Sequence, residues 1–94
     1  MADVHQRLHA QVSGHVQGVN FRYYTRVTAR ELGITGWVRN RSDGTVEVLA
    51  EGTPQQLERL LQFLNIGPVS ASVSQVQIDW LPATGEFADF QINQ

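Results

Sequence analysis

The sequence contains no cysteine, and this absence excludes disulfides, thiolate metal sites and cysteine nucleophiles. It also lacks any apolar run close to the ~20 residues that a membrane-spanning helix needs. No basic stretch followed by an apolar run stands at the N-terminus, so no signal peptide is predicted. We therefore expect a cytoplasmic protein that does not associate with membranes.

The sequence also has no excess of positively charged side chains. Seven basic and nine acidic side chains give a net charge of -2, which is the wrong sign for a protein that holds nucleic acid mainly through phosphate contacts. The charged fraction of 17% is too low for a disordered chain, and 94 residues are enough to bury a core. We expect a single domain, residues 1–94, and no nucleic-acid partner.

The first half of the chain alternates between strand and helix patterns. Apolar residues alternate with polar ones from Leu8 to Val12, which predicts a half-buried strand that ends near Gly14. The spacing becomes helical from Phe21, and Gly33 supplies the stop. The predicted buried face of this helix follows positions i, i+3, i+7 and i+11: Phe21, Tyr24, Thr28 and Leu32.

The second half repeats the alternation. Residues 34–40 and 45–51 are rich in β-formers and flank an Asp43-Gly44 turn, which predicts a hairpin. Residues 53–56, Thr-Pro-Gln-Gln, predict a capped helix start, and a leucine stripe follows until Gly67-Pro68 ends the helix. Alternation predicts a strand at residues 75–80, and a final short strand is expected at 89–92.

The resulting order is β-α-β-β-α-β with a short added strand. This order predicts an α+β fold of the split βαβ, or ferredoxin-like, class. Two helices are expected to cover one face of an antiparallel sheet.

The loop between the first strand and the first helix has features of an anion site. Gly14 and Gly18 permit backbone conformations in which successive N–H groups turn inward as a nest. The start of the helix adds its unpaired N–H donors at the same place. Arg22 stands against the positive end of the helix dipole, which is unfavourable unless an anion lies between. The sequence therefore predicts a phosphate cradle, although the residues fit neither a P-loop nor G-x-G-x-x-G.

A plainer reading of the same residues stays open. The two glycines could simply shape a strand-to-helix turn, with Arg22 on the surface. Arg26 and Arg30 follow at four-residue intervals, and we assign both to solvent.

Other polar residues are weaker candidates. His15 lies in the loop and could tune its pH dependence, but an exposed loop histidine is the expectation. His5 and His9 have no third ligand at a suitable spacing, so no metal site is expected. We interpret Asp43 and Glu47 as a turn residue and a surface residue, and not as a catalytic pair.

Two long motifs carry a resemblance to the acylphosphatase family. Residues 12–22, Val-Ser-Gly-His-Val-Gln-Gly-Val-Asn-Phe-Arg, resemble its first signature. Residues 36–40, Gly-Trp-Val-Arg-Asn, resemble the second, with Gly44, Val46 and Gly52 at the family's spacing. The likeness continues at Gly67-Pro68 and at residues 90–92, so it covers almost the whole chain.

The resemblance implies hydrolysis of the carboxyl-phosphate bond of acyl phosphates, giving a carboxylate and inorganic phosphate. By position, Arg22 would bind the phosphoryl group and Asn40 would orient the attacking water. The family's phosphate-binding loop corresponds to six residues, whose backbone would hold the phosphoryl group: Gly14, His15, Val16, Gln17, Gly18 and Val19. No cofactor is implied, and we expect a metal-independent monomer.

Two other functions stay open at this stage. An RNA-binding module could use the same fold, but no Lys/Arg-Gly-Phe/Tyr-Gly/Ala-Phe run is present. The stronger alternative is an inactive phosphate-binding or regulatory domain, or a domain cut from a larger protein. Arg22 and Asn40 are both intact, which favours activity. The chain starts with methionine and stops just after its last strand pattern, so we expect a free-standing enzyme.

Overall fold

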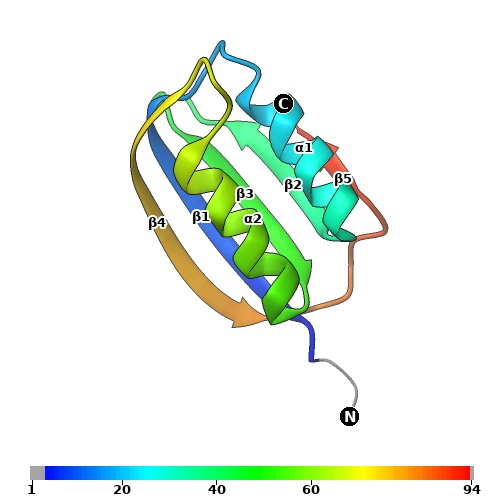
Figure 1. The fold of residues 1–94 in the computed structure, drawn as a ribbon. Coiled ribbons are helices and arrows are strands. Elements are labelled where there is room, and N and C mark those ends of the chain that lie inside the picture. The colour runs from blue at the N-terminus through cyan, green and yellow to red at the C-terminus, as the bar shows by residue number, and fades with distance from the viewer. Residues whose placement is uncertain (1–3, 94) are drawn as a thin grey trace.

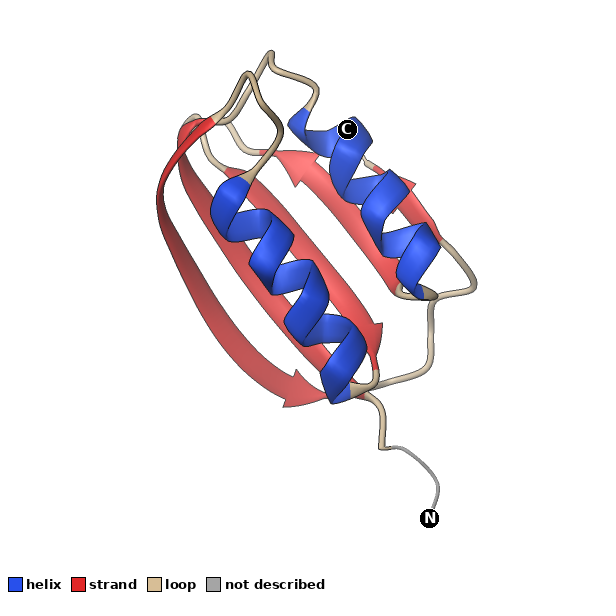
Figure 2. Ribbon diagram, in the orientation of Figure 1, coloured by secondary structure: helices blue, strands red, loops and turns tan. Residues whose placement is uncertain are grey.

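The computed structural model describes residues 4–93, which form one five-stranded sheet with two helices on one of its faces (Figures 1 and 2). The sheet has the strand order β4-β1-β3-β2-β5. The elements in chain order are β1 (Gln6–His15), α1 (Phe21–Leu32), β2 (Thr35–Asn40), β3 (Val46–Gly52), α2 (Pro54–Ile66), β4 (Ser72–Pro82) and β5 (Phe90–Ile92).

This architecture confirms the predicted α+β ferredoxin-like sandwich. Strands β1 to β4 pair only antiparallel to one another, as expected. The added strand β5 differs, because it pairs parallel to β2 and makes the sheet mixed. A parallel neighbour is possible here because the long connection after β4 carries the chain back to the far edge of the sheet (Figure 1).

The helix boundaries follow the predicted chemistry. Gly33 ends α1 with a φ of 77°, and Gly67 ends α2 with a φ of 72°, both in the region that favours glycine. The start of α2 has the complete capping box: Gln56 N donates to Thr53 Oγ1 at 3.2 Å, and Thr53 N donates to Gln56 Oε1 at 2.8 Å.

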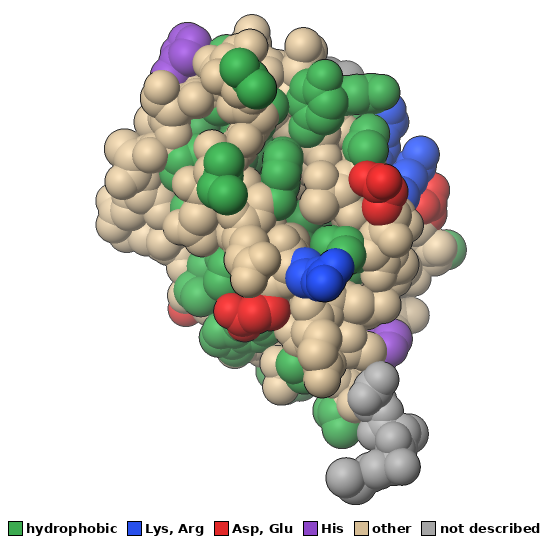
Figure 3. All heavy atoms as spheres, viewed as in Figure 1, with side chains coloured by type: hydrophobic (Ala, Val, Ile, Leu, Met, Phe, Trp, Pro, Cys, Tyr) green, Lys and Arg blue, Asp and Glu red, His purple; other side chains and the backbone are tan. Residues whose placement is uncertain are grey.

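The core lies between the sheet and the helices. Sixteen apolar residues with little or no exposed surface form it: Leu8, Ala10, Val12, Val16, Val19, Phe21, Ala29, Ile34, Val38, Val46, Val48, Ala50, Leu57, Leu60, Leu64 and Phe90. The alternation in β1 and the leucine stripe of α2 thus place their residues as predicted. The helical side also leaves hydrophobic side chains visible near the loops that precede α1 and follow α2 (Figure 3).

The predicted buried face of α1 is partly wrong. Its fully buried residues are Phe21, Thr25 and Ala29, whereas Tyr24 is 45% exposed. Thr25 can be buried because its hydroxyl donates to Phe21 O at 2.8 Å, which satisfies the polar group inside the helix. A pattern search that counts only apolar residues does not predict a buried threonine of this kind.

Arg30 is exposed, as we assigned it, but it also contacts the segment around the start of β5. Its Nε donates to Phe90 O at 3.1 Å, and its Nη2 lies 2.8 Å from Asp89 Oδ2. These contacts join α1 to the beginning of β5. Arg26 stands over the ring of Tyr23, with its guanidinium carbon 5.7 Å from the ring centroid.

Glu51 anchors the connection between β4 and β5 to the open face of the sheet. Its carboxylate is buried and accepts hydrogen bonds from Arg7 Nε at 2.7 Å, Thr84 N at 2.9 Å and Gly85 N at 3.0 Å. Since that connection leads into β5, this carboxylate helps to set the position of the last strand.

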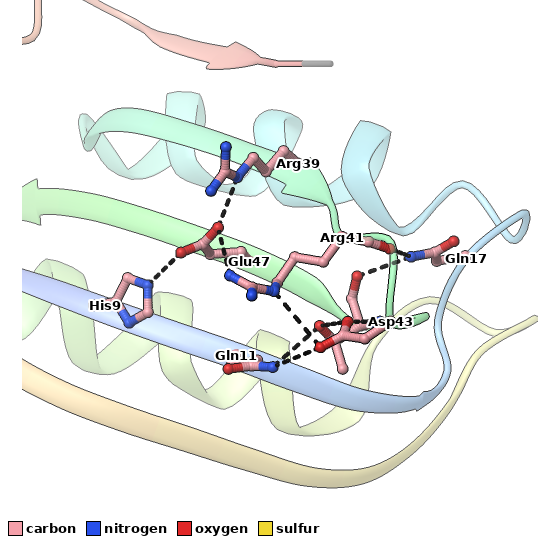
Figure 4. A network of polar contacts seen from close by, with 8 residues as sticks. His9, Gln11, Gln17, Arg39, Arg41, Asp43 and Glu47 are labelled. Carbon is pink, nitrogen blue, oxygen red and sulfur yellow. Dashed lines mark hydrogen bonds and ion pairs between the residues drawn. The ribbon is translucent and has the colours of Figure 1, made fainter.

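Glu47 forms the centre of a second polar cluster on the same face (Figure 4). Our interpretation of Glu47 as a surface residue is wrong, because it is only 6% exposed. His9 Nε2 lies 2.7 Å from one carboxylate oxygen, while Arg39 Nε, at 2.6 Å, and Arg41 Nη1, at 3.4 Å, approach the other. Neighbouring strands cover the carboxylate with cationic and polar side chains, and the periodicity of β3 alone does not reveal them. Asp43, in contrast, is the turn residue that was predicted, since it accepts from Thr45 N at 3.0 Å.

The environment of Glu47 lowers the pKa of its carboxyl. Burial by itself raises this pKa, but the hydrogen bonds from His9 and Arg39, together with the charge of Arg39, outweigh that effect. The folded state therefore binds this proton more weakly than the unfolded chain does, and the ionised form stabilises the fold.

We expect Glu47→Gln to lower the free energy of unfolding at pH 7 by about 1 to 2 kcal/mol, because it weakens charge-assisted bonds to partly exposed arginines. The contribution of Glu47 to the free energy of unfolding is fully present at pH values above the ordinary glutamate pKa of about 4.3. It disappears as the pH falls through the lowered pKa of Glu47 in the folded state. Urea denaturation of both proteins at pH 7 and at low pH measures the difference.

The matched control is Glu58→Gln, which changes an exposed carboxylate on α2. A gap between wild type and Glu47→Gln that stays the same from neutral to strongly acid pH would contradict the assigned role.

Helices α1 and α2 do not have the length and apolar character to cross a bilayer, and the structure describes no other helix within residues 4–93.

Candidate active site

Five residues, 16–20, connect the end of β1 to the start of α1. Val16 and Val19 are 1% and 9% exposed, so their side chains anchor this connection in the core. Gly18 and Asn20 both adopt left-handed backbone conformations, with φ values of 74° and 64°. Glycine does so without strain, and asparagine is among the side chains that tolerate it. The connection is therefore a defined turn with an anchored backbone.

Gly14 and His15 belong to β1 and not to this turn. Gly14 pairs with Val73, and His15 pairs with Ser72, next to an irregularity in the β1–β4 register. A Cβ on Gly14 would lie 2.2 Å from Ser72 O, so the close approach of β4 excludes a side chain there. His15 is exposed at the end of the strand. These two residues fix the direction from which the chain enters the loop.

The start of α1 leaves its positive end uncompensated. Asn20 is the N-cap residue but makes no side-chain cap hydrogen bond, and the first turn contains no acidic residue. Arg22, half-buried, is the second residue of the helix. Free N–H groups, the helix dipole and a guanidinium therefore all favour an anion at this point.

A cavity of about 240 Å³ opens at this helix start. It brings Arg22 together with Asn40, the last residue of β2. Its lining residues are Val16, Gly18, Asn20, Phe21, Arg22, Tyr23, Asn40 and Ile92. Its volume is below the ~300 to 1,000 Å³ of typical ligand pockets, which suits a phosphoryl group better than a nucleotide.

Sequence reasoning identified four of these lining residues: Val16, Gly18, Arg22 and Asn40. Gln17 and Val19 were proposed for their backbone N–H groups; their side chains lie elsewhere, that of Val19 in the core and that of Gln17 against the turn after β2. Asn20 was missed, although an asparagine just before a helix is a signal for a left-handed residue. Ile92 could not be found, because only the pairing of β5 with β2 brings it there.

Asn40 Oδ1 is buried, and no residue of the described chain forms a hydrogen bond with it. Leaving a buried acceptor unpaired costs about 1 to 3 kcal/mol, so such an atom in a native fold calls for an explanation. A carboxamide can donate and accept without titrating. The carboxamide of Asn40, a residue that lines the cavity beside an arginine, is suited to hold a water molecule or a ligand group.

Gln17 connects the loop to the turn that follows Asn40. Its Nε2 donates to Arg41 O at 2.8 Å and to Thr45 O at 2.9 Å, and Figure 4 shows the side chain reaching across to that turn. Two hydrogen bonds from a single amide nitrogen thus hold the loop at a set distance from the end of β2. The backbone role proposed for Gln17 did not include this side-chain function.

The cavity carries one permanent positive charge, from Arg22, and none of its lining residues is acidic. Such a balance favours an anionic ligand, and the planar guanidinium can bind two phosphate oxygens at once. Within residues 4–93, no group of three or more His, Cys, Asp or Glu side chains gathers in a way that could hold a metal ion.

Known proteins share both the sequence and the fold. The acylphosphatase family model matches residues 8–92. An acylphosphatase from Pelotomaculum thermopropionicum is 52% identical over 86 residues, which cover 92% of this chain and 94% of the relative. One from Marinobacter nauticus is 54% identical over 85 residues, covering 90% and 92%. The crystal structure of acylphosphatase from Bacillus subtilis has a TM-score of 0.91 at 31% identity, covering 95% of this chain and 99% of that one.

The family model extends from the first strand to the last, and relatives above 50% identity match over nearly their full length. The two signatures lie on the loop and on the β2–β3 hairpin, and the chain belongs to the acylphosphatase family.

Proposed function

We propose that this acylphosphatase hydrolyses the carboxyl-phosphate bond of acyl phosphates in the cavity at the start of α1. One observation carries the proposal. A permanent cation at an uncompensated helix N-terminus lines the same small cavity as Asn40, whose buried carboxamide oxygen has no hydrogen-bond partner in the described chain. The first suits the phosphoryl group, and the second suits the water that attacks it.

Arg22 binds the phosphoryl oxygens together with backbone N–H groups of residues 16–19 and of the first turn of α1. We limit the proposed loop contacts to these residues, since Gly14 and His15 are paired with β4. Preorganised donors of this kind stabilise the charge that the phosphoryl oxygens carry in the transition state, and they need no reorganisation during the reaction.

Asn40 orients the attacking water. The water oxygen bonds to phosphorus, the bond from phosphorus to the acyl oxygen breaks, and the carboxylate leaves with the electron pair. The proton of the water passes to a phosphoryl oxygen. A carboxylate is a good leaving group, so this chemistry needs positioning and charge stabilisation more than a general acid.

The alternative is an inactive phosphate-binding or regulatory domain of the same fold. Phosphate binding alone would account for Arg22 and the loop. It gives no reason for a buried, unpartnered oxygen on Asn40 beside the anion site. The hydrolytic proposal explains both residues and is therefore preferred.

The proposal extends to the location, cofactor requirement, partners and oligomeric state of the enzyme. We propose a cytoplasmic enzyme that needs no cofactor or metal and has no nucleic-acid or membrane partner, in keeping with its net charge of -2. We propose a monomer of one domain: the edge strand β4 carries Asp79 and ends at Pro82, and both features discourage pairing with another strand.

Wild-type protein should hydrolyse benzoyl phosphate in the presence of a strong chelator, because no step of the proposed reaction uses a metal. Loss of the ultraviolet absorbance of benzoyl phosphate measures the rate. A rate equal to that of buffer alone would overturn the hydrolytic function.

Arg22→Ala should lower kcat/KM by on the order of a hundredfold or more, since one preorganised donor contributes about 2.7 to 4 kcal/mol to the transition state. The inhibition constant for inorganic phosphate should rise in parallel. Arg59→Ala, which removes an exposed arginine on α2, is the matched control and should leave both constants near wild type.

Asn40→Ala should reduce kcat strongly and leave the inhibition constant of inorganic phosphate almost unchanged, because the side chain acts on water and not on the phosphoryl group. Steady-state kinetics with phosphate as competitor separate the two effects, and Asn65→Ala on the exposed side of α2 is the control. Weakened phosphate binding with unchanged kcat would refute the role of Asn40.

A further inference from the structure

A second hollow lies between the start of α1 and the end of α2. We call it the apolar groove; its volume is about 320 Å³. Besides Asn20 and Ser70, its lining consists of Val19, Tyr24, Phe63, Pro68 and Val69, and none of its lining residues is charged. It therefore differs in chemistry from the arginine cavity beside it.

The groove holds apolar side chains that folding has left uncovered. Val69 is fully exposed and Tyr24 nearly half exposed, although both are apolar in most of their surface. The Tyr24 ring stands edge-on to Tyr23 at a centroid distance of 5.1 Å, and Phe63 packs against Phe21 at 6.0 Å. Hydrophobic side chains gather at this end of the helical side in Figure 3. Exposed apolar surface around a hollow commonly marks a binding site.

The groove adjoins the proposed phosphoryl site. Asn20 lines both the arginine cavity and the groove, and Tyr23 of the cavity contacts Tyr24 of the groove. A substrate whose phosphoryl group lies at Arg22 can thus extend past Asn20 onto apolar surface. A phosphate ion alone would leave this surface uncovered.

The direction of the reaction agrees with this placement. In phosphoryl transfer the attacking and leaving oxygens lie roughly in line on opposite sides of phosphorus. Asn40, which holds the water, lines the arginine cavity but is not among the lining residues of the groove. The leaving carboxylate points away from the attacking water, and the apolar groove, which Asn40 does not line, is the adjoining surface proposed for its acyl group.

We infer that the apolar groove binds the acyl group of the substrate, and that the enzyme prefers acyl phosphates with an apolar or aromatic acyl group. This inference rests on the proposed hydrolytic function. An acyl group with its own charge would lose water in the groove without gaining a partner, so such substrates are disfavoured. A pocket of this kind discriminates by roughly 10-fold to 200-fold between apolar groups of different size.

The test compares benzoyl phosphate, which has an aromatic acyl group, with acetyl phosphate, whose methyl group cannot fill the groove. Tyr24→Ser and Val69→Ser remove apolar surface from the groove at exposed positions. Ile66→Ser is the matched control, since Ile66 is an equally apolar, exposed residue that does not line the groove. Circular dichroism verifies that each variant is folded.

We expect wild type to have a kcat/KM for benzoyl phosphate at least about 10-fold above that for acetyl phosphate. The double variant Tyr24→Ser/Val69→Ser should raise KM for benzoyl phosphate several-fold and leave acetyl phosphate hydrolysis and phosphate inhibition unchanged. Equal effects on both substrates, or none on either, would overturn the groove assignment while the hydrolytic function stands.

Inhibition or direct binding by benzylphosphonate and methylphosphonate gives a second readout that does not depend on turnover. Wild type should bind benzylphosphonate more tightly, and the double variant should lose that advantage. A wild type that hydrolyses neither substrate would overturn the hydrolytic function itself. The phosphonate pair would then still decide whether the groove accepts an apolar substituent next to the anion.

Discussion

The antiparallel pairing of β3 with both β1 and β2 determines where the proposed active site lies. Because both neighbours run opposite to β3, they run in the same direction and end at the same edge of the sheet. The register is specific: Val12 of β1 and Asn40 of β2 both pair with Val46 of β3. The loop that begins after β1 therefore starts close to Asn40. A slip of one residue would turn Asn40 to the opposite face of the sheet, away from the loop.

The two faces of the sheet have different structural roles. On the helix-covered face, Val16 and Val19 anchor the loop in the same core that holds α1 in place. On the open face, Glu47 and Glu51 organise ionic clusters that join strands β1, β2 and β3 and the connection to β5. Gln17 links the two regions, since it belongs to the loop but bonds to the turn after β2. Changes in the open-face clusters can thus alter stability without contacting the proposed site.

Much of the fold could be predicted because its signals are local. Capping at Thr53, glycine stops at Gly33 and Gly67, and strand alternation in β1 depend on residues a few positions apart, and the structure contains them all. The predictions failed where burial depends on partners distant in the chain. Glu47 is buried by side chains of two other strands, and Thr25, whose hydroxyl bonds to Phe21 O, lies on the buried face of α1 in place of Tyr24.

The sequence by itself determined the family, through two long signatures, and the anion-favouring loop, because Gly14, Gly18 and Arg22 act within a short stretch of chain. The resemblance to the family then supplied the roles proposed for Arg22 and Asn40. Only the tertiary structure decided that Asn40 Oδ1 is buried without a partner among residues 4–93, that Ile92 lines the cavity, and that Val69 and Tyr24 line one groove. These features arise from strand register and helix packing, which bring together residues as far apart in the chain as Val16 and Ile92. No local sequence pattern predicts these long-range contacts, because they depend on how the whole core packs.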